Sequence, residues 1–254
     1  MKRLILALFA TLALAQTPAV AATPTYGYHV VHAYPHDTGA FTEGLFYLDG
    51  YLYESTGLEQ HSTLRKVDLA TGQVLQQISV APQYFGEGIV AWGHKLVELT
   101  WRSHVGFIYD LSTFEKKGEF HYPGEGWALT SDGHSLIMSD GTPALRFLDP
   151  DTLTERHRLT VTAEGKPVAN LNELEWVDGE ILANIWQTDF IARIDPKSGH
   201  VVGWIDVGAL HRQIGYADSD AVPNGIAWDA AKRRLFVTGK DWPTLFEIVP
   251  PKGR

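Results

Sequence analysis

Three glutamates and two asparagines recur at comparable places in five similar strings of this sequence, and each could bind a polar group or exchange a proton. They are Glu43, Glu87, Glu125, Asn172 and Asn224, separated by steps of 44, 38, 47 and 52 residues. Three carboxylates held close together repel one another unless a cation binds among them or a pKa rises. The set therefore predicts cation binding or proton transfer if the fold gathers it. The alternative is a polar, solvated channel without a function.

Large aromatic residues and one lysine accompany these polar positions. Trp101, Trp186 and Lys240 follow the second β-rich run of their units at comparable offsets, whereas Phe85 and Trp127 flank two of the glutamates. Apolar walls around a few polar groups are typical of a small-molecule pocket. We expect Trp101, Trp127 and Trp186 to form such walls. The other strand tryptophans are expected to pack between sheets: Trp92, Trp176, Trp204 and Trp228.

A repeated unit of about 45 residues, the size of one propeller blade, has to position these residues. After its polar position, each unit has an apolar run, a turn, a second run and then an alternating strand ending on aspartate, as in residues 63–68 and 191–195. Alternation bounded by Gly, Pro, Asn and Asp is typical of antiparallel sheet. The sequence thus predicts an all-β, five-bladed β-propeller with four strands in each blade, whose innermost strands line a central channel.

The fifth unit is incomplete, because residues 244–249 supply only its third strand. An open ring would expose strand edges that favour aggregation. Residues 28–33, which precede the first unit, have a strand-like pattern, and we expect them to pair with the blade of residues 235–249 and close the ring. Helical periodicity is limited to a short turn near residues 210–214.

The first 22 residues have the pattern of a secretory signal peptide: two basic residues, an apolar run over residues 4–15, and small residues ending in Ala19-Val20-Ala21-Ala22. The apolar run is shorter than the roughly 20 residues needed to cross a bilayer. We therefore expect an exported protein, periplasmic or secreted, with no membrane segment after cleavage. Residues 23–254 are expected to form a single catalytic propeller domain.

Composition excludes several classes of protein. A chain of 254 residues with 44% hydrophobic residues can form a sizeable core, and a net charge of −9 disfavours a nucleic-acid partner. The absence of cysteine excludes disulfides, thiolate metal sites and a cysteine nucleophile. His29 and His32 would lie on opposite faces of a strand, so no metal site is assigned to them.

Eight strings resemble the glutamine cyclotransferases of plants and bacteria, also called glutaminyl-peptide cyclotransferases, and the resemblance extends over nearly all of residues 23–254. The strings are Phe41-Thr42-Glu43-Gly44-Leu45, Tyr53-Glu54-Ser55-Thr56-Gly57, Phe85-Gly86-Glu87-Gly88, Leu99-Thr100-Trp101, Gly124-Glu125-Gly126-Trp127, Ser139-Asp140-Gly141-Thr142, Leu171-Asn172-Glu173-Leu174-Glu175 and Asn224-Gly225-Ile226-Ala227. The resemblance implies a five-bladed propeller. It also implies conversion of the N-terminal glutamine of peptides or proteins to pyroglutamate, with release of ammonia and without a catalytic metal or other required cofactor. We expect a monomer. The sequence does not decide whether a structural cation binds in the channel.

The implied reaction is an intramolecular acyl transfer in which the substrate's α-amine attacks its own side-chain carboxamide. The resemblance places the catalytic carboxylate at Glu87, and the flanking Phe85 is expected to raise its pKa. Asn172 and Lys240 are expected to donate to the amide oxygen as it gains charge. Glu43, where plant relatives usually carry glutamine, is expected to bind the amino group. The expected substrate-binding residues are Phe41, Glu43, Phe85, Trp101, Trp127, Trp186, Glu125 and Asn224.

Two other functions fit parts of the pattern. A calcium-dependent lactonase or esterase propeller would use axial glutamates and asparagines to hold its metal. Such enzymes are usually six-bladed, whereas this chain has five units. A propeller that only binds a partner would leave the three recurring glutamates unexplained.

Overall fold

The computed structural model describes residues 22–215 and 219–249 of the chain. The expected leader, residues 1–22, lies outside these residues except for its last position, so export stays a prediction. Among the described residues no helix has both the length and the apolar character that spanning a membrane requires.

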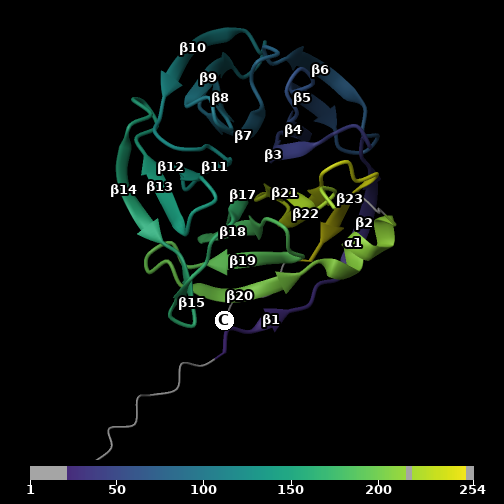
Figure 1. Cartoon of the computed structure of the whole chain (residues 1–254). Coiled ribbons are helices and arrows are strands. Elements are labelled where there is room, and N and C mark those ends of the chain that lie inside the picture. Colours follow the sequence, from purple (N-terminus) through teal and green to yellow (C-terminus); the bar gives the residue numbers. More distant parts are fainter. Residues whose placement is uncertain (1–21, 216–218, 250–254) are drawn as a thin grey trace, which may run out of the picture.

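Five β-sheets surround a central axis like the blades of a propeller, as predicted (Figure 1). Blade one contains β3 (Thr42–Leu48), β4 (Tyr51–Thr56), β5 (Thr63–Asp68) and β6 (Val74–Ser79). Blade two contains β7 (Gly86–Trp92), β8 (Lys95–Thr100), β9 (Val105–Asp110) and β10 (Lys116–His121). Blade three contains β11 (Ala128–Ser131), β12 (Leu136–Ser139), β13 (Ala144–Leu148) and β14 (Glu155–Thr160).

The last two blades each include a strand from the N-terminal segment. Blade four contains β17 (Leu171–Val177), β18 (Glu180–Ile185), β19 (Phe190–Ile194), β20 (Val201–Asp206) and β1 (Thr25–Tyr26). Blade five contains β21 (Pro223–Asp229), β22 (Arg234–Gly239), β23 (Thr244–Ile248) and β2 (Val30–Pro35). A small hairpin, β15 (Thr162–Ala163) and β16 (Lys166–Pro167), and the helix α1 (Gly208–Ile214) lie outside the blades.

The N-terminal segment closes the ring as predicted, because β2 pairs antiparallel with β23 at the outer edge of blade five. Blade four differs from the prediction of four strands, since β1 adds a fifth strand parallel to β20. The guanidinium of Arg193 lies 4.9 Å from the centre of the Tyr26 ring and holds this strand. Two residues are too short to give a recognisable strand pattern.

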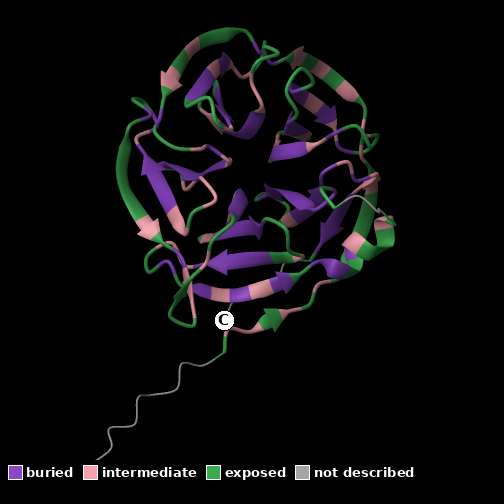
Figure 2. Ribbon diagram, viewed as in Figure 1, coloured by how far each residue is buried: buried purple, intermediate pink, exposed green. Residues whose placement is uncertain are grey.

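Burial decreases from the axis outward (Figure 2). All seven residues of the innermost strand β21 are buried, whereas the outermost strand β6 alternates between half-buried and exposed residues. Among the described residues the apolar core is divided into five clusters, each formed by two adjacent blades, and the cluster between blades four and five also includes residues of α1. The four tryptophans that we assigned to packing (Trp92, Trp176, Trp204 and Trp228) all lie in or against these clusters.

The innermost strands converge so closely that some positions accept only glycine. A Cβ atom on Gly44 would lie 2.6 Å from the backbone nitrogen of Ile89, and one on Gly88 would lie 2.2 Å from the Cα of Ala128. Each of β3, β7, β17 and β21 also has a shift in register just after its first pair. Such bulges re-aim side chains, and these four contain the axial Glu43, Glu87, Asn172 and Asn224.

The junction between blades five and one contains a buried ionic network. His36, which follows β2, bonds Glu54 through Nε2 at 2.9 Å and the carbonyl of Trp242 through Nδ1 at 2.6 Å. The hydroxyl of Thr42 donates to the same carboxylate at 2.7 Å, and Arg65 Nη1 lies 3.7 Å from it. The closing strand is thus tied to blade one by charge as well as by packing.

We expect His36→Gln to lower the free energy of unfolding by about 1–3 kcal/mol, because it leaves the buried Glu54 short of a partner. Burial alone would lower the pKa of His36, but Glu54 and the Trp242 carbonyl raise it above 6.5. Burial raises the pKa of Glu54, but His36 and Arg65 bring it below 4.5. The histidine's contribution is therefore complete below 6.5 and lost as pH rises through its folded value, whereas the glutamate's is lost only in acid.

Urea unfolding of the wild type and His36→Gln from pH 4.5 to 8.5 measures this contribution. The difference between them should be largest near pH 5–6 and shrink at alkaline pH. His29→Gln, at an exposed position, is the matched control and should show no such dependence. A difference independent of pH would contradict the ionic account of the junction.

Candidate active site

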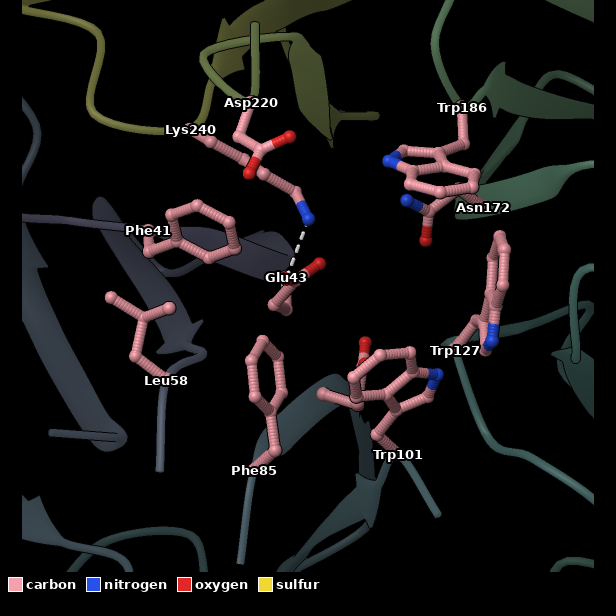
Figure 3. A pocket seen from close by; sticks show the side chains of 11 residues that line it. Phe41, Glu43, Leu58, Phe85, Trp101, Trp127, Asn172, Trp186, Asp220 and Lys240 are labelled. Carbon is pink, nitrogen blue, oxygen red and sulfur yellow. Dashed lines mark hydrogen bonds and ion pairs between the residues drawn. The ribbon is translucent and has the colours of Figure 1, made fainter. Parts of the chain in front are cut away.

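A cavity of about 230 Å³ lies at one end of the central axis (Figure 3). Its lining comes from the starts of the innermost strands and from the ends of the second strands. These meet at one edge of each blade because the two strands are antiparallel. The lining residues are Phe41, Glu43, Leu58, Phe85, Glu87, Trp101, Trp127, Asn172, Trp186, Asp220 and Lys240.

A buried ion pair forms one side of the cavity. Lys240 donates from Nζ to Oε1 of Glu43 at 2.6 Å (Figure 3). Asn224 donates from Nδ2 to Oε2 of the same carboxylate at 3.1 Å and to the carbonyl of Thr42 at 2.9 Å. Burial raises the pKa of Glu43, while Lys240 and Asn224 hold the rise down. The lysine, whose Nζ also lies 4.4 Å from the centre of the Phe41 ring, keeps N–H groups for a ligand.

Asn224 does not line the cavity, contrary to its predicted role in substrate binding. It is completely buried, and its amide nitrogen is used by Glu43 and Thr42. Its place on the axis was predicted correctly. By donating to Oε2 of Glu43, it orients this carboxylate.

Glu87 differs from Glu43 in having no such partner. It is only 5% exposed, and no described residue donates a hydrogen bond to its carboxylate. Burial raises the pKa of Glu87 well above 4.5, the charge of Glu43 raises it further, and Lys240 opposes the shift. Its backbone is held in place, because Ser55 Oγ donates to its carbonyl. The cavity thus contains one carboxyl group poised to take up or release a proton.

Glu125 is not an axial residue, which corrects the sequence prediction. Gly44 pairs with Ser55 in blade one and Ala128 pairs with Ser139 in blade three, so Trp127 is the counterpart of Glu43. The Gly-Glu-Gly string of blade three resembles that of blade two but lies in the loop before β11, two residues out of register. Repeated residue types alone could not reveal this offset.

The loop position gives Glu125 a different task. Its Oε2 accepts hydrogen bonds from the indole nitrogens of Trp101 at 2.7 Å and Trp127 at 2.9 Å. Arg102 donates to its other oxygen at 3.1 Å and covers the Trp101 ring at 3.6 Å. Glu125 does not line the cavity but fixes the orientation of two of its walls.

The predicted aromatic walls are present. On one side Phe85 contacts Phe41 and Trp101, with ring centres 6.2 Å and 5.4 Å apart. On the other, Trp127 and Trp186 meet edge to face at 5.6 Å. Gly57 makes room for the first wall, since a Cβ there would lie 2.3 Å from the Phe85 ring.

Asn172 contributes an amide to the lining. It is 3% exposed, and its side-chain oxygen Oδ1 has no partner among the described residues. Its backbone carbonyl accepts a hydrogen bond from Ser139 Oγ at 2.8 Å. Buried polar atoms without partners are rare in folded proteins. An amide of this kind at the cavity surface is suited to bind a polar ligand.

Two lining residues were not predicted. Leu58 follows β4 as Trp101 follows β8, so its position relative to the second strand could have identified it. Asp220 lies in the loop before β21, where no repeated pattern marks it.

The cavity is smaller than the roughly 300–1,000 Å³ typical of sites for drug-sized ligands, so it suits one amino-acid side chain and its neighbouring amine. Its groups can donate hydrogen bonds and move a proton. The described residues include no cluster of three or more His, Cys, Asp or Glu suited to a metal. The carboxylate of Glu43 is already paired with a cation, the ammonium group of Lys240.

Comparison with known proteins agrees with this geometry. The sequence model of the glutamine cyclotransferase family matches residues 3–249. A glutaminyl-peptide cyclotransferase of Arabidopsis thaliana is 46% identical over 224 residues, covering 86% of this chain and 70% of the relative. The crystal structure of Myxococcus xanthus glutaminyl cyclase superposes with a TM-score of 0.83 at 38% identity, covering 87% of this chain and 95% of that one. The WD40 propeller domain of Doa1, with a TM-score of 0.50 at 10% identity over 82% of this chain and 63% of that one, shares the fold.

We expect Glu43→Gln to lower the pKa of Glu87. The substitution removes the negative charge that raises this pKa and leaves the Lys240 charge that lowers it. Carbon-13 NMR of the glutamate carboxyl signals, assigned with Glu87→Gln, measures the shift. Glu98→Gln removes another buried carboxyl that does not act on Glu87 and serves as the control. An unchanged or higher pKa would refute the coupling between the two axial glutamates.

Proposed function

This chain belongs to the glutamine cyclotransferase family and converts the N-terminal glutamine of peptides to pyroglutamate with release of ammonia, and we propose that Glu87 carries the proton that this reaction must move. The observation that carries the proposal is the environment of that carboxyl group. It lies in the lining of a cavity sized for one residue, buried, without a hydrogen-bond donor among the described residues and with a raised pKa. A proton carrier works best when its pKa lies near the working pH.

Binding of the glutamine residue uses both kinds of wall. The aromatic rings of Trp101, Trp127 and Trp186 pack against the methylene groups of the side chain and exclude water. This matters because attack by water would give glutamate in place of the lactam. The carboxylate of Glu43 has acceptor capacity beyond its two bonds and receives the substrate's amino group.

The reaction then needs only proton transfer and charge stabilisation. The α-amine attacks the side-chain carboxamide carbon, a C–N bond forms, and the carbonyl oxygen becomes an oxyanion. Lys240 and Asn172 donate to that oxygen. Glu87 takes a proton from the attacking nitrogen and gives it to the leaving nitrogen, the C–N bond to that nitrogen breaks, and ammonia departs. The cavity holds amine and carboxamide together, which supplies much of the rate enhancement.

We propose that no metal takes part. Glu43 is neutralised by Lys240, and Glu173, a buried carboxylate next to the axial Asn172, accepts hydrogen bonds from the backbone N–H groups of two other strands. This arrangement disfavours the calcium-dependent lactonase alternative, whose metal would need those oxygens. The family assignment replaces the alternative of a non-catalytic binding module.

We propose that the substrates are peptides or proteins that begin with glutamine, and that the enzyme acts as a monomer. The leader pattern of residues 1–22 supports export to the periplasm or the medium.

Glu87→Gln should lower kcat by at least about 10²-fold with little change in KM, because general acid–base groups contribute on the order of 10²–10⁴. The two side chains have nearly the same shape, so packing is kept. Ammonia release from a Gln-peptide measures the rate, and circular dichroism checks the fold. If the variant kept more than about a third of wild-type turnover, the proton carrier would have to be another axial carboxylate.

Activity should be unchanged after prolonged dialysis against EDTA, since every proposed role belongs to a protein side chain. The assay compares treated enzyme, treated enzyme with added calcium or zinc, and untreated enzyme. Loss of ammonia release that a metal restores would overturn the metal-free mechanism and favour a channel cation.

A further inference from the structure

We propose that Glu173 is a positioning residue that sets the geometry of the Glu43–Lys240 pair by binding the backbones of two neighbouring blades. The proposal rests on the proposed function, because it assigns a cause to the placement of two groups used there. Glu173 lies on β17, is 1% exposed and does not line the cavity. It therefore acts through other residues.

The side chain of Glu173 joins three innermost strands. Its Oε1 accepts a hydrogen bond from the backbone N–H of Leu45 on β3 at 3.3 Å, and its Oε2 accepts one from Ile226 on β21 at 2.8 Å. Leu45 is two residues after Glu43, and Ile226 is two residues after Asn224. One carboxyl group thus bridges the two strands whose side chains hydrogen-bond to each other beside the cavity.

The need for such a bridge comes from propeller geometry. An innermost strand is the edge of its sheet, so N–H groups that face the channel have no neighbouring strand to accept from them. The register shift in β21 falls directly before Ile226, and that in β3 ends at Gly44, the residue before Leu45. Glu173 supplies the missing acceptor to both strands and fixes their separation.

This arrangement is costly for stability. Burying a carboxyl group without a cation is unfavourable, and no described lysine, arginine or histidine forms an ion pair with Glu173. Burying an uncharged amide here would cost less free energy, but an amide has only one acceptor atom. A carboxyl group provides two acceptors that point to different strands, as this position requires.

Glu175 provides a matched control. It lies two residues along the same strand, is half-buried, and also accepts hydrogen bonds from two other blades, through the backbone N–H of Trp228 at 2.9 Å and the Thr130 hydroxyl at 3.2 Å. Trp228 is four residues from Asn224, farther from the cavity than Ile226. Loss of Glu175 should weaken the fold in a similar way without disturbing Glu43.

The experiment compares wild type, Glu173→Gln, Glu175→Gln, Glu43→Gln and the double variant Glu173→Gln/Glu43→Gln. Ammonia release from Gln-Gln gives kcat and KM, and thermal unfolding gives stability. We expect both Glu173→Gln and Glu175→Gln to lower the unfolding temperature. Only Glu173→Gln should lower kcat/KM by about tenfold or more at a temperature where both are folded, because small misplacements of reacting groups are costly.

Coupling to Glu43 separates positioning from general stability. If Glu173 acts through Glu43, its substitution should have a much smaller effect in the Glu43→Gln background, and the two effects should not be additive. Additive effects, or equal losses of kcat/KM in Glu173→Gln and Glu175→Gln, would overturn the proposal.

Two further outcomes are informative. If Glu173→Gln does not fold, Glu173→Asp replaces it, and failure of both while Glu175→Gln folds would assign Glu173 to folding and overturn the positioning role. Absence of ammonia release by folded wild-type enzyme would refute the proposed function itself. Full activity of Glu173→Gln beside an active wild type would refute only the inference about Glu173.

Discussion

Convergence of the five innermost strands on one axis is the constraint on which the rest of this structure depends. Each of these strands is a sheet edge, so its inward N–H and C=O groups need partners that the blade cannot supply. Side chains of neighbouring blades supply them: Ser55 and Ser139 donate to the carbonyls of Glu87 and Asn172, and Asn184 accepts from the N–H of Gly225. Satisfying the backbone therefore also fixes the axial residues.

The same convergence determines the electrostatics of the site. Side chains at the starts of the inner strands must share a small, poorly solvated volume, so equal charges there interact strongly. One of the two cavity glutamates is compensated by Lys240, which enters from the end of the second strand of blade five. Glu87 has no ion-pair partner among the described residues, and its pKa rises well above 4.5 through burial and the neighbouring charge although Lys240 opposes the shift. The difference between two similar glutamates thus arises from which blade provides a cation.

The fold could be predicted because the patterns that specify each blade lie within short stretches of the sequence. Runs with turns between them recur at blade spacing, and the missing strand of the last unit pointed to residues 28–33. The strand β1 could not be predicted, since two residues carry no periodicity and are held by a contact to Arg193 in a distant part of the chain. The prediction of which residues line the cavity was correct where residue type and strand position agreed, as for Glu43, Glu87, Asn172 and Lys240, whose roles in the reaction stay predictions. It was wrong for Glu125, because a repeated Gly-Glu-Gly string outweighed the register of the strand that follows it.

Two roles within the site illustrate why register decides function in a repeated fold. In the axial position, Trp127 forms a wall, while Glu125, two residues earlier, holds the indole nitrogens of Trp101 and Trp127. An acidic residue in the axial position of blade three would add a further negative charge beside Glu43 and Glu87 without a second lysine to offset it. A tryptophan there excludes water and adds no charge, so the pKa of Glu87 is not raised further by another acidic neighbour and the carboxyl group can still give up its proton and act as a base. The departure of blade three from the repeat is therefore part of what makes the other blades' carboxylates usable.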